Sequence, residues 1–240
     1  MTTIDLRRTP TVVATPHVVS PVTGLTALAQ PARVAAVAAI AAVPPITLLH
    51  LSATGGVEPV GWTISDYVVT LPYGVPLYAM TVGALAIGGG VLVRGLAQLA
   101  GTRSLRILLA IWAAALLATA VFPTNHRGTP EDISSNVHLI AGAVVFAVLP
   151  VAGLLLARWL RSTTGRTAMT IAVTVVSVIS GLLSLALILN RLPGVVGLPQ
   201  LMLPPGILQR SAGALEIVLL AVIGLAVLVS VHRVRVPAGR

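Results

Sequence analysis

An acidic residue, Glu216, lies inside the apolar run Ile207–Val231 near the end of the chain. It is about nine residues into that run, or roughly 13 Å along a helix, which is close to the middle of a bilayer. An ionisable side chain at this depth costs several kcal/mol unless it is protonated, paired or hydrated. We therefore expect Glu216 to face the protein interior, where its candidate partners are His50, His138, Arg210 and the hydroxyls of the fifth span. Two roles stay open for it: the handling of a proton or substrate, and a structural hydrogen bond between helices.

The most polar stretch of the chain, residues 122–138, ends in His138. Ser134 and Ser135 precede this histidine by four and three residues, so either hydroxyl can contact the imidazole on one face of a helix. We expect Asp132, Ser134 or Ser135 to cap that helix by accepting its free N–H groups.

The same loop contains a candidate set of metal ligands, His126, Asp132 and His138, because zinc binds imidazole and carboxylate groups when three or four of them converge. A serine four residues before a histidine is similar to an element of the ceramidase- and adiponectin-receptor-type membrane hydrolases. Those enzymes use a paired His-x-x-x-His on a late helix, and the five histidines of this chain form no such pair. The sequence therefore favours a capped, hydrogen-bonded loop without a metal ion.

Asp66 and Arg210 complete the polar candidates. Asp66 or its neighbour Ser65 is expected to cap a short helix before the second apolar run, and Arg210 opens the last run. We predict an outward-facing polar pocket built from six residues, Asp66, His126, Asp132, His138, Arg210 and Glu216. Within it, Glu216, His138 and Asp66 are the candidates for a catalytic acid or base.

Composition indicates the environment in which these side chains act. Hydrophobic residues make up 56% of the 240 residues and charged residues 9%, whereas a soluble domain has about 25% charged residues. The chain is therefore expected to be an integral membrane protein whose apolar surface contacts lipid. All 15 basic residues are arginines between apolar runs, which indicates membrane topology rather than a nucleic-acid surface. No cysteine and no phosphate-binding glycine loop occurs, and no cofactor is expected.

Six apolar runs are long enough for a membrane helix, which needs about 20 residues. The predicted fold class is therefore all-α, a polytopic bundle of six transmembrane helices. The first run contains Pro44-Pro45, which is expected to kink its helix. The expected spans are Arg33–Ala53, Leu71–Val93, Leu105–Phe122, Asn136–Ala157, Thr167–Asn190 and Ile207–Val231.

The arginines set the orientation of this bundle. Twelve of them fall on one side of the six spans and three on the other, and short arginine-rich segments remain in the cytoplasm. Both termini are therefore expected to be cytoplasmic, in a bacterial inner membrane. Residues 1–32 are expected to form a flexible cytoplasmic tail, residues 33–231 the transmembrane domain and residues 232–240 a basic cytoplasmic tail.

Four short motifs carry a resemblance to a known family: Ser65-Asp66-Tyr67, Phe122-Pro123-Thr124, the run His138–Ala143 and the run Gly206–Arg210. They resemble the bacterial domain-of-unknown-function 998 family of membrane proteins. That family is similar in layout to the six-helix proteins related to the damage-regulated autophagy modulators. The resemblance implies a six-helix fold and a membrane location over roughly residues 33–231, and it supplies no reaction. Such proteins often have an acidic residue after Phe-Pro-Thr, where this chain has Asn125.

The leading functional hypothesis is a membrane protein of unassigned role whose polar pocket faces outward. Its expected partners are membrane lipids and a lipid or hydrophobic small molecule. A membrane enzyme acting on a lipid or isoprenoid is the first alternative, with His138 or Glu216 as general acid or base. A small proton-coupled transporter centred on Glu216 is the second, and an accessory subunit of an unidentified membrane protein is the third. An enzyme predicts polar residues in one lipid-accessible cleft, and a transporter predicts that Glu216 lines a cavity.

Overall fold

The structure, a computed structural model, describes residues 21–52, 58, 60–126, 128–130, 132–196 and 203–235, and it describes residues 21–23 and 191–196 by their backbone. The described residues form helices joined by connections without a strand among them. The helices are α1 (Pro21–Ala27), α2 (Ala29–Ala41), α3 (Val43–Leu51), α4 (Ile64–Thr70), α5 (Gly74–Leu96), α6 (Arg103–Val121), α7 (Ile133–Thr164), α8 (Ala168–Val196) and α9 (Pro205–Arg235).

Within the part of the chain that the structure describes, six helical segments are long and apolar enough to cross a membrane, which confirms the predicted all-α bundle of six transmembrane helices. The first combines α1, α2 and α3, and the others are α5, α6, α7, α8 and α9. Large apolar side chains on their outward faces are exposed, for example Ile40, Ile87, Ile140 and Leu182. In a bilayer these faces contact acyl chains, so their exposure costs nothing there.

The first span begins earlier in the chain than the sequence predicts. α1 starts at Pro21, inside the segment 1–32 that the sequence assigns to a tail. Leu25, Leu28 and Ala32 are buried in the core, because α1 and α2 pack against α9. This burial stabilises a helix whose proline- and threonine-containing start shows no clear period in the sequence. Residues 1–20 and 236–240 of the predicted tails lie outside the described residues.

Pro44-Pro45 interrupts the first span, as the sequence predicts. α2 ends at Ala41, and α3 begins at Val43 with prolines in its first turn. A proline has no N–H to donate to the preceding turn, whereas in the first turn of a helix that N–H would have no partner within the helix. The interruption therefore lies where the lost hydrogen bonds cost least.

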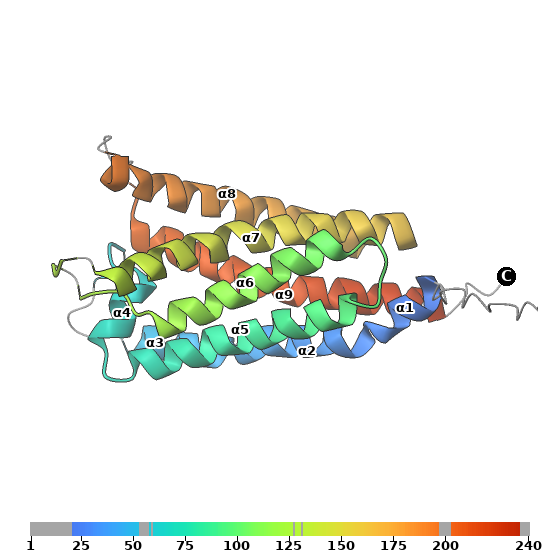
Figure 1. Cartoon of the computed structure of the whole chain (residues 1–240), viewed down its shortest axis with the longest axis horizontal. Coiled ribbons are helices and arrows are strands. Elements are labelled where there is room, and N and C mark those ends of the chain that lie inside the picture. Colours follow the sequence, from blue (N-terminus) through green and yellow to red (C-terminus); the bar gives the residue numbers. More distant parts are fainter. Residues whose placement is uncertain are drawn as a thin grey trace, which may run out of the picture.

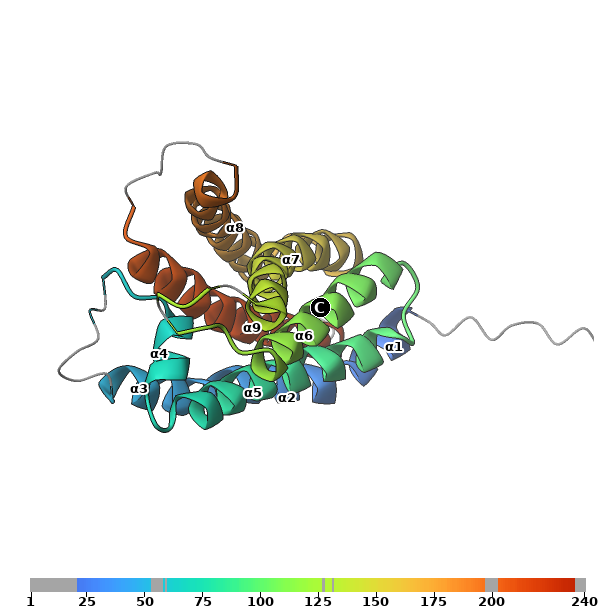
Figure 2. The ribbon, with the colours of Figure 1, turned by 60° about the vertical axis from the view of Figure 1, so that its left-hand side comes forward.

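The spans form a closed ring with one helix outside it. In order around the ring, α2, α5, α6, α7 and α9 each pack against the next, and α9 packs against α2. α8 packs on the outside, against α7 and α9 (Figures 1 and 2). The core between these helices consists mainly of alanine and leucine, and Trp112 is the largest fully buried side chain among the described residues.

The two ends of the bundle differ in charge. α1 begins and α9 ends at one end, together with the α5–α6 and α7–α8 connections (Figure 1). We call it the arginine end, because these arginines lie toward it: Arg33, Arg94, Arg103, Arg106, Arg158, Arg161, Arg166, Arg233 and Arg235. We call the opposite end, which contains α4 and the first turns of α5, α7 and α9, the polar end. It has the described carboxylates outside the spans, Glu58, Asp66 and Asp132, and it also has Arg210.

Candidate binding cavity

A cavity of about 440 Å³ lies inside the ring at the polar end. Its walls come from α3, α4, α5, α6, α7 and α9. Along α9 it is lined from Gln209 to Val218, which corresponds to about 14 Å at the helical rise of 1.5 Å per residue. Its volume falls within the range of about 300–1,000 Å³ that is typical of small-molecule sites.

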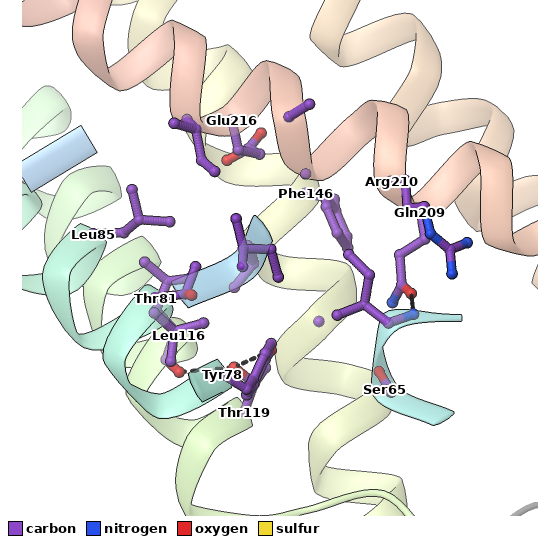
Figure 3. Close-up of a pocket in the computed structure, with 18 of the residues that line it drawn as sticks. Ser65, Tyr78, Thr81, Leu85, Leu116, Thr119, Phe146, Gln209, Arg210 and Glu216 are labelled. Carbon is purple, nitrogen blue, oxygen red and sulfur yellow. Dashed lines mark hydrogen bonds between the residues drawn. The ribbon is translucent and has the colours of Figure 1, made fainter. Parts of the chain in front are cut away.

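The two ends of this cavity differ in polarity (Figure 3). Polar side chains line the end near α4: His50, Ser65, Tyr78, Thr119, His138, Gln209 and Arg210. The deeper part is lined mainly by apolar side chains, including Leu85, Leu116, Val145 and Ile217. Glu216 is the acidic residue of this deeper part. The cavity is therefore amphipathic along its length.

The imidazole of His138 is held on both sides. Its Nδ1 lies 2.8 Å from the carbonyl oxygen of Phe122 and 3.1 Å from that of Thr119, at the end of α6. Its Nε2 lies 3.0 Å from Oγ of Ser65 on α4. Because carbonyl oxygens only accept, Nδ1 carries the proton in the neutral ring, and Nε2 then accepts from the Ser65 hydroxyl. His138 is 8% exposed, so these contacts fix its orientation.

Tyr78 supports the same histidine from α5. Its hydroxyl donates to Oγ1 of Thr119 at 2.9 Å, and Thr119 in turn donates to the carbonyl oxygen of Leu116 at 2.8 Å. The Tyr78 and His138 rings lie with their centroids 6.3 Å apart. Three spans, α5, α6 and α7, thus converge on one imidazole.

Glu216 is buried between α6 and α8, with 2% of its surface exposed. Its Oε2 accepts from Nε1 of Trp112 at 3.0 Å, and its Oε1 accepts from Oγ of Ser180 at 3.3 Å. Both donors are neutral side chains. The prediction that Glu216 faces the interior, toward hydroxyls of the fifth span, agrees with this placement, whereas the sequence did not indicate Trp112 as a partner.

Arg210 ties the start of α9 to α4 and to the segment before it. Its Nη1 donates to the carbonyl oxygen of Trp62 at 2.9 Å, and its guanidinium lies 4.6 Å from the centroid of the Tyr67 ring. The adjacent Gln209 accepts from the N–H of Ile64 at 2.6 Å. Burial raises the pKa of the Tyr67 hydroxyl, and the positive charge of Arg210 opposes that shift.

His50 is a second imidazole at the polar end of the cavity. Its Nδ1 donates to the carbonyl oxygen of Ile46 at 2.6 Å, one turn earlier in α3. Its ring meets the buried Tyr67 ring edge to face, with centroids 5.9 Å apart. The sequence named His50 as a partner of Glu216, but the structure places it beside Tyr67, because α3 ends at the polar end whereas Glu216 lies deeper.

Three of the six residues predicted for the pocket line the cavity, namely His138, Arg210 and Glu216. Asp66, His126 and Asp132 are not among its lining residues. Asp66 accepts from the N–H and the hydroxyl of Thr63, at 2.7 and 2.9 Å, in the capping box that begins α4. Its carboxylate therefore serves the helix start.

The polar loop before α7 is built as a cap. Asp132 accepts from the N–H of Ser135 at 2.8 Å, and Ser135 accepts from the N–H of Asp132, so both form the capping box of α7. Ser134 donates to the carbonyl oxygen of Pro123. Neither serine bonds His138, and the predicted contact along α7 is wrong, because the Ser135 hydroxyl belongs to the cap and the Ser134 hydroxyl bonds Pro123. Among the described residues no group of three histidines or carboxylates could hold a metal ion, so His126, Asp132 and His138 are not assembled as ligands.

The residues that the sequence analysis missed are Ser65 as the partner of His138, together with Tyr78, Trp112 and Gln209. Ser65 and His138 are 73 positions apart in the chain, and Trp112 and Glu216 are 104 apart. The local signal available was the presence of polar side chains, those of Trp112 and Tyr78, in otherwise apolar spans. That signal marks polar groups that need a partner in lipid, but it does not pair them.

Comparison with known proteins identifies the family of this chain. The model of a family described as "Protein of unknown function (DUF998)" matches residues 34–229, which is most of the chain. No curated protein and no solved structure matches it. The match covers most of the transmembrane bundle and every residue that lines the cavity. The chain therefore belongs to the DUF998 family of proteins of unknown function.

Proposed function

We propose that this protein is a multi-pass protein of a bacterial inner membrane with both termini in the cytoplasm. The support is the charge difference between the two ends of the bundle. Nearly all described arginines lie at the arginine end, and arginines in short connections remain on the cytoplasmic side during insertion. In this orientation the polar end of the cavity faces the outer side of the membrane.

Single introduced thiols test this orientation, because the chain has no cysteine of its own. We expect Asn136→Cys, at the polar end, to react with a membrane-impermeant maleimide in intact cells. Arg161→Cys, at the arginine end, should react only after the membrane is opened. Reaction of both thiols from the same side, or the reverse pattern, would contradict the proposed orientation.

The function that the geometry supports best is binding of an amphipathic small molecule inside the bundle. The observation that carries this proposal is the cavity itself, which has hydrogen-bonding groups and a guanidinium at one end and an apolar lining below. A ligand with a polar head and a short apolar tail matches both parts. The head would lie beside Arg210 and His138, and the tail would extend toward Glu216 over no more than about 14 Å.

The lining also indicates what kind of head group fits. Arg210 supplies a positive charge that suits an anionic or ester-containing head. Ser65, His138 and His50 add polar groups that can be donors or acceptors toward a carbonyl oxygen. Glu216 has both carboxyl oxygens bonded to protein donors, so it shapes the floor of the cavity rather than binding the head.

Trp112 provides a reporter for this proposal, since it lines the deep part of the cavity. The other two tryptophans, Trp62 and Trp159, are replaced by phenylalanine, and the protein is placed in lipid nanodiscs. Alkanoic acids of six to twelve carbons with a terminal bromine are then added as contact quenchers. We expect saturable quenching of Trp112 that is strongest for one chain length.

A matched pair of glycine variants separates cavity binding from quenching through the surrounding lipid. An added Cβ at Gly213 meets only Ile64 Cδ1 at 3.9 Å, so Gly213→Leu fills the cavity without a backbone clash. Gly90 is exposed on α5 with nothing within 4 Å of its added Cβ, so Gly90→Leu adds the same side chain toward lipid. Gly213→Leu should weaken the apparent affinity about tenfold, and Gly90→Leu should leave it unchanged. Equal quenching in both variants would show that the acids do not enter the cavity.

A further inference from the structure

We propose that Ser65 and His138 form a nucleophile–base pair that cleaves carboxylic esters held in the cavity. This inference rests on the proposed binding function, because the cavity must first admit the ester. It assigns a reaction class to the site: acyl transfer from an ester to the Ser65 hydroxyl, followed by hydrolysis.

The geometry of His138 is that of a general base. Its Nδ1 faces two carbonyl oxygens, those of Phe122 and Thr119, which keep the proton on that nitrogen. The lone pair of Nε2 is thereby directed at the Ser65 hydroxyl, 3.0 Å away. That separation lies within the range of about 2.6–3.2 Å expected for an activated nucleophile, and a third group that orients the base completes the arrangement. Here backbone carbonyls take the orienting role.

Ser65 differs from two threonine hydroxyls of the cavity, those of Thr81 and Thr119. Thr81 donates to the carbonyl oxygen of Leu77 at 3.0 Å, and Thr119 donates to that of Leu116 at 2.8 Å, each within its own helix. A carbonyl oxygen cannot take up the proton of an attacking hydroxyl. Ser65 instead meets a nitrogen base, on a different helix. It is also half-buried and lines the cavity, so an ester bound there can reach it.

Both members of the pair are held in place before a substrate arrives. α4 is short, but its start is fixed by the capping box of Thr63 and Asp66 and by Gln209, which accepts from the N–H of Ile64. His138 is fixed by α6 and by the packed ring of Tyr78. Positioned groups of this kind lose little entropy when the reacting atoms meet. Ligand binding alone does not explain these polar contacts. They are explained by the pair that they hold in place.

The reaction balances with the groups present and one water molecule. Ser65 Oγ attacks the ester carbonyl carbon as its proton passes to Nε2 of His138, and the carbonyl oxygen becomes an oxyanion beside the charged end of the cavity where Arg210 lies. The carbon–oxygen bond to the alcohol then breaks, and His138 returns the proton to the leaving oxygen. Water, deprotonated by His138, attacks the acyl-serine, the bond from the acyl carbon to Ser65 Oγ breaks, and His138 returns the proton to that oxygen. This step releases the carboxylic acid and restores both Ser65 and the neutral imidazole. The net reaction is ester plus water to acid plus alcohol.

The shape of the cavity indicates the ester class. The apolar part below Ser65 accepts the acyl chain, and the alcohol part leaves toward the polar end. The length of the lining on α9 limits the acyl chain to about 14 Å. We therefore expect medium-chain acyl esters to react faster than either acetyl or long-chain esters.

The first test uses the absence of cysteine. Ser65→Cys creates the single thiol of the chain, and His138 should convert it to a reactive thiolate at neutral pH. We expect iodoacetamide to alkylate Ser65→Cys at pH 7 about tenfold faster than Ser65→Cys/His138→Gln. Ser211→Cys, also half-buried at the polar end but outside the cavity lining, is the matched control and should not depend on His138. An alkylation rate at position 65 that is undetectable, or equal with and without His138, overturns the proposal.

The second test measures the reaction in the full chain in nanodiscs. We expect hydrolysis of p-nitrophenyl octanoate, and covalent labelling by an alkyl fluorophosphonate at Ser65 located by peptide mass spectrometry. Ser65→Ala should lower turnover about 100-fold while its melting temperature stays that of the wild type, and Ser211→Ala should retain full turnover. The proposal is overturned if the label persists in Ser65→Ala. It is also overturned if the wild-type chain hydrolyses the ester no faster than Ser65→Ala does.

The two proposals fail in different ways. If Trp112 quenching is saturable but turnover is absent and the thiol is insensitive to His138, the cavity binds a ligand and the catalytic proposal is wrong. If the thiol depends on His138 but no alkanoic acid quenches Trp112, the pair is reactive and the binding proposal is wrong. The small neutral alkylating reagent makes this separation possible, because it does not need the apolar part of the cavity.

Discussion

Two glycines on α9, Gly213 and Gly224, lie in opposite surroundings. A Cβ added at Gly224 would lie 2.7 Å from the backbone oxygen of Ala32 and 3.0 Å from Ala36. A Cβ added at Gly213 would meet nothing closer than Ile64 Cδ1 at 3.9 Å. The same residue type thus allows close approach of two helices in the arginine half and leaves open space in the polar half.

α7 repeats the difference. A Cβ at Gly153 would collide with Ser177 of α8, whereas one at Gly142 would have nothing within 4 Å. Small residues let membrane helices approach closely, and that approach is a main source of their association. The bundle is therefore packed closely toward the arginine end and is more open toward the polar end. The cavity is the space that this more open packing leaves, and the packed half keeps its walls in place.

The largest effect is expected where α9 packs against the backbone of α2. Gly224→Ala places a methyl group against the backbone of α2, which cannot move aside as a side-chain end can. Overpacking of this kind costs about 1–3 kcal/mol, and we expect the upper part of that range because the neighbour is a carbonyl oxygen. The measurement is the free energy of unfolding in mixed detergent micelles. A stability equal to that of the wild type would mean that α2 and α9 are not in contact at Gly224.

A smaller effect is expected at the cap of α7. Asp132→Ala removes the acceptor for the N–H of Ser135 and half of the capping box, which costs about 1 kcal/mol. Asp132→Asn keeps an acceptor and should cost less. Because Asp132 does not line the cavity, Trp112 quenching should be unchanged in both variants. Loss of quenching in Asp132→Asn at unchanged stability would assign the carboxylate to the site rather than to the helix.

Most of the fold is predictable from the sequence, for a physical reason. In lipid every backbone group needs an internal partner, so an apolar run of sufficient length must be a helix, and the six runs indeed coincide with six helical spans. The start of the first span was predicted less well. Residues such as Leu25 and Leu28 become helical through burial against α9, and a contact with the other end of the chain leaves no local pattern.

The site is predictable only in part, because the rules for reading a sequence apply within one helix and do not pair residues on different helices. Glu216 and His138 stand out because an ionisable side chain within an apolar span costs free energy. The spacing rule for helices then selected the wrong partner for His138, since it searches along one helix and Ser65 lies on another. For Asp132 the rule for helix caps was correct, because Asp132 is the N-cap of α7. For α4 the N-cap is Thr63, and Asp66 is its partner in the capping box. Neither carboxylate belongs to the cavity lining.

The contact between Trp112 and Glu216 tests whether the floor of the cavity belongs to the packed half. Trp112→Phe removes the donor to Oε2, and Glu216→Gln weakens the acceptor. A double-mutant cycle on unfolding free energy should give a coupling of about 0.6 kcal/mol, the average for hydrogen bonds between membrane helices. Trp112→Phe and Asp132→Ala share no partner and serve as the control pair, whose effects should add. Additive effects for Trp112 and Glu216 would mean that the hydrogen bond contributes nothing to holding α6 against α9.

A small effect of opposite sign is expected at Gly213. Gly213→Ala adds a methyl group that finds open space, while it lowers the backbone entropy of the unfolded chain. Alanine in place of a helical glycine is more favourable by about 0.5–1 kcal/mol, so this variant should be slightly more stable than the wild type when the same unfolding measurement is made. Gly213→Ala and Gly224→Ala each add one methyl group to α9, and they are expected to change the free energy of unfolding in opposite directions. We expect this difference from a bundle that is packed at one end and open at the other. Destabilisation by Gly213→Ala would mean that the helices close over the cavity in the membrane, and the bromoalkanoic acids should then fail to reach Trp112 as well.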